Sequence, residues 1–98
     1  MSNTLRIRLL LAMQAALLGS VSSNIRVISC GFDGDDVRIK VIFDGAIPEL
    51  DRGIMDEVGT ELASHFDGAS VEVECARIDA PQDFRDCLLD WCVYLRRE

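Results

Sequence analysis

Carboxylates are the most prominent reactive side chains of this sequence, and many of them follow the dipeptide Asp44-Gly45. Closely spaced carboxylates can hold Mg²⁺ or Ca²⁺, act as an acid–base pair, or form a charged surface for a protein partner. The segment DGAIPELD does not match the spacing of an EF-hand calcium loop, and no second acid cluster with a fixed spacing accompanies it. The pattern therefore does not support a metal site, a cofactor site or a catalytic pair, and it leaves open whether these acids form a docking surface or only keep a small domain in solution.

Two groups of acids are the candidates for this surface. The first group belongs to a predicted helix and the turn that leads into it, and the second alternates along a predicted strand. The expected partner-binding residues are Asp44, Glu49, Asp51, Asp56, Glu57, Glu61, Glu72 and Glu74.

Four cysteines and one histidine offer the alternative of zinc binding or thiol chemistry. Cys87 and Cys92 are separated by four residues, whereas zinc knuckles favour two, and His65 is the only histidine. Cys30 and Cys75 lie in strand-like patterns, which suits small buried hydrophobic residues. No nucleophile, base and electrophile stabiliser come together in the sequence, so we expect a protein that is not an enzyme.

The distribution of charge argues against direct binding to nucleic acid. The chain has a net charge of −7, and 16 of its 17 acids lie between residues 33 and 90 with only five basic residues. This acidic region repels phosphate backbones, and its natural complement is a basic protein. The segment GFDGDD resembles a phosphate-binding loop only in its glycines, because it joins two strands and contains three acids.

The chain begins with a segment that has two alternative interpretations. MSNTLRIRLLLAMQAALLGSVSS has the outline of a secretory signal, with two arginines, an apolar stretch and small residues. Cleavage near Ser23 would remove most of the strongest apolar segment and leave about 75 residues to build a core. We therefore favour a helix over 4–18 that ends at Gly19, in a cytoplasmic protein with reduced thiols. Its expected buried stripe is Leu5, Leu9, Ala12, Met13, Ala16 and Leu17.

Apolar alternation and turn residues predict the remaining elements. Residues 25–32 and 37–43 form strands joined by the turn DGDD, with Ile25 and Val27 on one face of the first strand and Arg26 and Ile28 on the other. A helix over 48–66 follows, with the stripe Leu50, Ile54, Val58, Leu62 and Phe66. Strands over 70–79 and 91–95 complete the order αββαββ, with a short helical turn or a loop between them. The prediction is one α+β domain over residues 1–98, with two helices and a four-stranded, mainly antiparallel sheet.

Four segments give the chain a likeness to a known family. These are ALLGSVSSNIRVI, IKVIFDGAIPELDRGIMDEVGTEL, RIDAPQ and the closing VYLRRE, which together touch most of the sequence. They resemble a family of small bacterial immunity proteins carried beside polymorphic toxins of the contact-dependent growth inhibition type. The segment DFRDCLLDWC and the cysteines depart from the family pattern.

The resemblance implies a function that needs no catalytic apparatus. An immunity protein binds a cognate toxin domain one to one, and a basic nuclease would fit the acidic surface. Two other hypotheses remain open. One is a structural or regulatory module that forms homodimers through a sheet edge, and the other is a small thiol-dependent enzyme.

Overall fold

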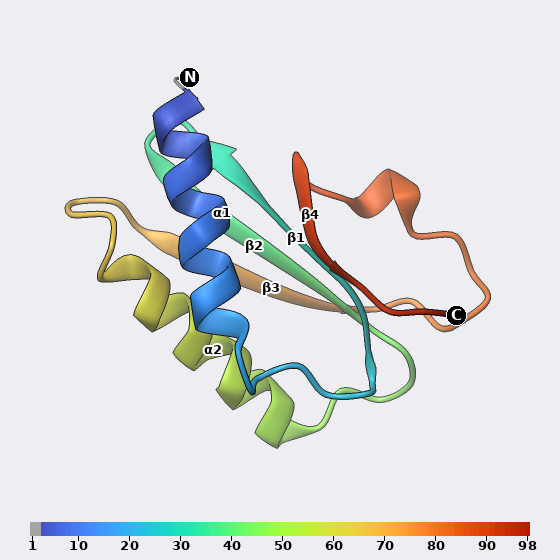
Figure 1. Ribbon diagram of the computed structural model, residues 1–98. Coiled ribbons are helices and arrows are strands. Elements are labelled where there is room, and N and C mark those ends of the chain that lie inside the picture. The colour runs from blue at the N-terminus through green and yellow to red at the C-terminus, as the bar shows by residue number, and fades with distance from the viewer. Residues whose placement is uncertain (1–2) are drawn as a thin grey trace.

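The computed structural model describes residues 3–98 and confirms the predicted order of elements (Figure 1). Helix α1 and helix α2 alternate with pairs of strands, and a short 3₁₀ helix, η1, precedes the last strand. The bounds are α1 Asn3–Leu17, β1 Ile25–Asp33, β2 Asp36–Phe43, α2 Glu49–Ala63, β3 Val71–Arg77, η1 Arg85–Cys87 and β4 Trp91–Leu95.

The four strands form one mixed sheet in the order β3-β2-β1-β4. Strand β1 is antiparallel to both β2 and β4, and the β1–β2 pair is the predicted hairpin, joined by a tight turn with Gly34 at φ +62°. Strand β3 is parallel to β2. The parallel pairing follows from α2, because a helix that crosses between two neighbouring strands returns the chain to the end of the sheet where the first strand began.

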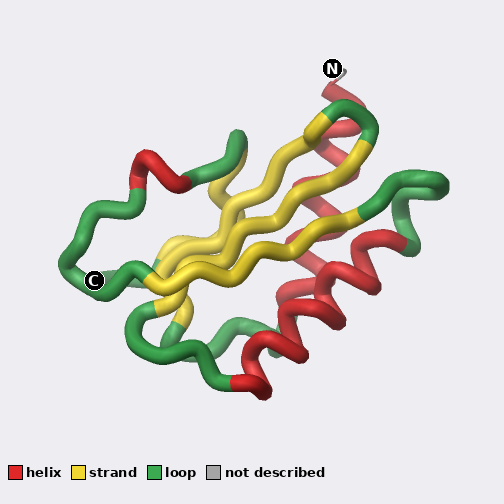
Figure 2. Tube along the Cα trace, turned by 180° about the vertical axis from the view of Figure 1, so that it is seen from behind, coloured by secondary structure: helices red, strands yellow, loops and turns green. Residues whose placement is uncertain are grey.

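Both helices pack on the same face of the sheet, and the chain between β3 and β4 projects to the other side (Figures 1 and 2). The core lies between the helices and the sheet, and it includes Leu9 and Met13 of α1, Met55 and Leu62 of α2, and Phe43 of β2. On the other side of β1, the backbone N–H of Leu89 donates to the Ser29 hydroxyl at 3.0 Å. The face of the sheet opposite the helices is therefore only partly covered.

Helix α1 confirms the helical interpretation of the first segment. Its buried residues are Leu9, Ala12, Met13, Ala16 and Leu17, and Gly19 follows it with φ +76°. Leu5, expected in the buried stripe, is 36% exposed. No helix within residues 3–98 has both the length and the apolar character needed to cross a bilayer.

Helix α2 buries the later part of the predicted stripe, with Val58, Leu62 and Phe66 buried and Ile54 partly buried, but not its first residue. It spans Glu49–Ala63, and its buried residues are Asp51, Met55, Val58, Gly59 and Leu62. Leu50, predicted to begin the buried stripe, is 73% exposed. The physical reason is the helical repeat: residues four apart are rotated by about 40° relative to each other, so a run of strict four-residue steps drifts off any single face.

Candidate functional site

The acids of α2 separate into one buried residue and four exposed ones. Glu49, Asp56, Glu57 and Glu61 are exposed and lie away from the buried face of the helix. Within residues 3–98, none of these four carboxylates has a basic group within 4.0 Å. Their charge is therefore not balanced by an ion pair in the part of the chain that the structure describes, and Arg52 is the only basic residue of the helix.

Asp51 is the buried acid of α2 and is hydrogen-bonded within the fold. Its side chain is buried, and the Ser22 hydroxyl donates a hydrogen bond to its carboxylate at 3.0 Å. This bond ties the connection after α1 to the first turn of α2. Asp51 therefore belongs to the buried face of α2, although the sequence places it among the expected partner-binding residues, because its carboxylate can accept from Ser22 while α2 packs inward.

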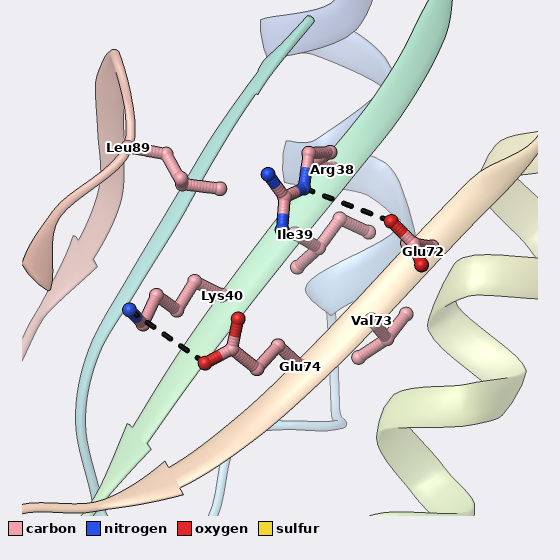
Figure 3. A pocket seen from close by; sticks show the side chains of 7 residues that line it. All are labelled: Arg38, Ile39, Lys40, Glu72, Val73, Glu74 and Leu89. Carbon is pink, nitrogen blue, oxygen red and sulfur yellow. Dashed lines mark ion pairs between the residues drawn. The ribbon is translucent and has the colours of Figure 1, made fainter. Parts of the chain in front are cut away.

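Glu72 and Glu74 lie on β3 opposite basic residues of β2 (Figure 3). The parallel register places Arg38 beside Glu72 and Lys40 beside Glu74, and each pair has a nitrogen–oxygen distance of 3.7 Å. These residues line a hollow of about 280 Å³ that Leu89 also borders. The charges of this face are thus matched in pairs within the sheet.

Asp44 is also engaged within the chain. Arg96 donates to one of its oxygens at 2.9 Å, and the backbone N–H of Ala80 donates to the other at 3.2 Å. The bond from Arg96 is the main reason that the pKa of Asp44 is lowered from its usual value. Asp44 therefore joins the turn after β2 to the ends of β3 and β4.

This contact belongs to a larger group of charged residues that sequence analysis did not identify. We call it the charged cluster, and it consists of Arg26, Asp44, Asp79, Arg96 and Glu98. Arg26 is its centre: its guanidinium donates to both oxygens of Glu98 at 2.8 Å and to the carbonyls of Ile78 and Gln82. The guanidinium also lies 4.7 Å from the centre of the Phe84 ring.

Asp79 connects the charged cluster to the turn at Gly45. Its carboxylate accepts from the Gly45 N–H at 2.7 Å and from Arg77 at 3.0 Å. Arg96, in addition to Asp44, donates to Glu98 at 2.9 Å. The cluster therefore draws one residue or more from each of the four segments that carry the family likeness. The sequence therefore contained a signal for the charged cluster, namely the acids and arginines that recur in these four segments.

A bulge in β1 explains how a charged side chain came to be buried. The pairing with β2 shifts register between Ile25 and Val27, so that Ile25 packs in the core with Ile28. The expectation that Ile25 and Val27 share a face is therefore wrong. The Arg26 side chain therefore lies in the charged cluster, where its guanidinium forms four hydrogen bonds.

The two cysteines of the strands β1 and β3, Cys30 and Cys75, lie in surroundings that disfavour an activated thiol. All four are free, and burial raises the pKa of Cys30 to about 12. Burial also raises the pKa of Cys75. Among residues 3–98, no three His, Cys, Asp or Glu side chains are grouped so that they could hold a metal ion. These surroundings disfavour a thiol nucleophile at Cys30 or Cys75, since the thiolate is the reactive form.

Comparison with protein families shows which family the chain belongs to. The model of the MafI2 immunity protein family matches residues 6–98, which is nearly the whole sequence. The chain belongs to the MafI2 immunity protein family. No curated protein matches it. Membership confirms the resemblance to small bacterial immunity proteins, and it implies a toxin-neutralising role with a toxin as partner.

Proposed function

We propose that this MafI2-family chain neutralises a basic nuclease toxin domain in the cytoplasm, binding it one to one through the exposed acids of α2. Nucleases need positively charged surfaces because their substrates are polyanions. An acidic helix complements such a surface and speeds the encounter of the two proteins. The four exposed, unpaired acids of α2 are the observation that carries this proposal.

The contrast with the sheet face explains the choice of α2. A toxin lysine approaching Glu72 or Glu74 would compete with Arg38 and Lys40, whose charges already balance these glutamates. Asp56 and Glu57 form no ion pair with any residue of 3–98, so a lysine approaching them displaces none there. Exposed ion pairs are individually weak, so the α2 acids act together on the rate of association more than on the stability of the fold.

The test is charge reversal on α2 in cells that also express the toxin encoded beside this chain. Replacing Glu49, Asp56, Glu57 and Glu61 by lysine should abolish protection and co-purification, while thermal unfolding stays close to wild type. Asp51 is left unchanged because it is buried and bonded to Ser22.

The control variant carries the same change in net charge elsewhere. Asp33, Asp35, Asp86 and Asp90 are exposed and also lack an ion pair among the described residues, and their replacement by lysine should leave protection largely intact. Full protection by the α2 variant would exclude α2 as the docking face. A toxin that stays lethal beside the wild-type chain would overturn the proposed partnership itself.

A further inference from the structure

Helix α1 is apolar on two opposite faces, and only one of them faces the core. Its outer side carries Ile7 and Leu11, which are 55% and 62% exposed, and Leu18 in the turn that directly follows is 78% exposed. Of the six large hydrophobic residues that are exposed within residues 3–98, four belong to α1 or this turn. A helix that is apolar all round is typical of a position covered on both sides.

The outer face of α1 is also free of charge along its centre. We call this strip the α1 crest and define it as Ile7, Leu11, Gln14, Ala15 and Leu18. The two charged residues of α1 turn to opposite flanks of the helix. Arg6 lies 5.8 Å from the Trp91 ring of β4, and Arg8 donates to the His65 carbonyl at 2.6 Å and lies 5.0 Å from the Phe66 ring.

The spacing of the α1 crest suits pairing with an identical helix. Ile7, Leu11, Gln14 and Leu18 follow one another at steps of four, three and four residues, which is the spacing of a coiled-coil seam. These steps are symmetric about the middle of the helix. In an antiparallel pair, Ile7 therefore meets the second copy's Leu18, and Leu11 meets the second copy's Gln14, as a two-fold axis requires.

Charge complementarity also favours a second copy over a basic partner at this surface. Two chains of net charge −7 repel each other, but α1 contains no acid, so its crest is where two copies approach with least repulsion. A basic toxin domain gains no attraction from an uncharged strip flanked by Arg6 and Arg8. The partner that matches this face is apolar, uncharged and of the same length, which the crest of another copy supplies.

We propose that the α1 crest is a self-association surface through which two copies of this chain pair with their α1 helices antiparallel. The crest spans three helical turns, about 16 Å at 1.5 Å per residue, which is short for a permanent dimer. The pairing is therefore reversible and depends on protein concentration. This inference is independent of the toxin and of the docking face assigned to α2.

The test is sedimentation of the full chain from micromolar to millimolar concentration. We expect the apparent mass to rise towards that of a dimer, and Leu11→Glu to weaken the association by roughly tenfold or more. Leu95→Glu is the matched control, because Leu95 on β4 is 63% exposed and Leu11 is 62% exposed. Glutamate favours helix formation, and circular dichroism checks that the variant is folded.

Three results would overturn the proposal. They are a wild-type chain that stays monomeric up to millimolar concentration, a folded Leu11→Glu variant that associates like wild type, and equal weakening by Leu95→Glu. A toxin-binding assay separates the two proposed surfaces. Leu11→Glu should protect cells as well as wild type does, and loss of protection by a folded Leu11→Glu variant would be a fourth contradictory result, because it would assign the crest to the toxin.

Discussion

Arg26 shows how one buried charge can organise a small domain. Its side chain is 3% exposed, and its donors reach both oxygens of Glu98 and two backbone carbonyls of the chain that follows β3. A buried guanidinium is tolerated only when its donors are satisfied, and here every partner comes from a distant part of the sequence. The residue therefore fastens β1, the segment after β4 and the loop between β3 and β4 to one another.

Glu98 gives this fastening a pH dependence. Hydrogen bonds from Arg26 are the main cause of the fall in the pKa of Glu98 from 4.5 to about 2. A carboxyl group whose pKa is lowered by folding stabilises the fold above its ordinary pKa and loses that contribution as the pH falls towards the lowered value. The contribution of Glu98 is therefore present above pH 4.5 and is lost between about 4.5 and about 2.

We predict that Glu98→Gln is less stable than wild type at neutral pH and that the difference disappears near pH 2. Urea unfolding of both proteins across this range measures it. Asp83→Asn is the control, since the pKa of Asp83 also falls to about 2, but its partner Arg85 is only two residues away. A pair two residues apart can also form in the unfolded chain, so its removal should change stability less. A constant gap between wild type and Glu98→Gln would contradict the prediction.

At the scale of elements, α2 contains two glycines that the sequence does not distinguish. Both Gly53 and Gly59 lower helix propensity, by roughly 1 kcal/mol each relative to alanine. In the folded chain, a Cβ added at Gly53 has no atom within 4 Å, whereas one at Gly59 lies 2.7 Å from a methyl group of Val73. Gly59 thus allows α2 to pack closely on β3.

We predict that Gly53→Ala raises the free energy of unfolding by about 0.5 to 1 kcal/mol through helix propensity. Gly59→Ala gains the same propensity but overpacks Val73, and overpacking costs roughly 1 to 3 kcal/mol. Denaturant unfolding should therefore rank Gly53→Ala above wild type and Gly59→Ala well below Gly53→Ala. Equal stabilisation by both substitutions would show that β3 gives way to α2 without cost.

The same element shows what the sequence could and could not predict. Pro48, the first-turn acids and the apolar spacing located α2 within three residues of its bounds. Only the start of the buried face was misplaced, because Leu50 is apolar and Asp51 is charged, and hydropathy alone ranks them in the wrong order. The Ser22 hydroxyl that satisfies Asp51 lies 29 residues earlier in the chain, so only the tertiary structure shows it.

The first segment illustrates the same limit in another form. Its apolar residues gave it the outline of a secretory signal, and these residues occupy two faces of α1 in the structure. The inner face was predicted well, from Leu9 to Leu17. The outer face received no role from the sequence, because a pattern that is apolar all round does not say which side meets the core.

At the scale of the whole molecule, the fold was predicted more fully than the site. Alternating strands and turn glycines indicated the order αββαββ, but the parallel β2–β3 pairing depends on how α2 crosses the sheet. The acids of the candidate docking surface could not be chosen from the sequence, because the choice depends on which acids form ion pairs in the folded chain. Asp44, Glu72 and Glu74 looked like the α2 acids in sequence, and their basic neighbours come from other strands or from the end of the chain.

This division of the acids gives a final prediction about the rate of toxin binding. Charges that are unpaired and exposed attract a basic partner over the distance that salt leaves unscreened, about 10 Å at 0.1 M and 3 Å at 1 M. The association rate constant should therefore fall steeply with salt for wild type. Replacing all four exposed α2 acids by their neutral amides should make the association rate constant depend less on salt; the acids are Glu49, Asp56, Glu57 and Glu61. The dissociation rate constant should change little, because desolvated contacts are not screened.

The comparison that decides this is between two neutralised proteins of equal net charge. Amide replacement of Asp33, Asp35, Asp86 and Asp90 removes the same number of charges from surfaces that α2 does not form. Stopped-flow association with the toxin over a salt series should show a smaller loss of slope for this variant, because the nearest charges dominate at short screening lengths. Identical slopes for the two variants would mean that the toxin responds to the net charge of the chain and not to the acids of α2.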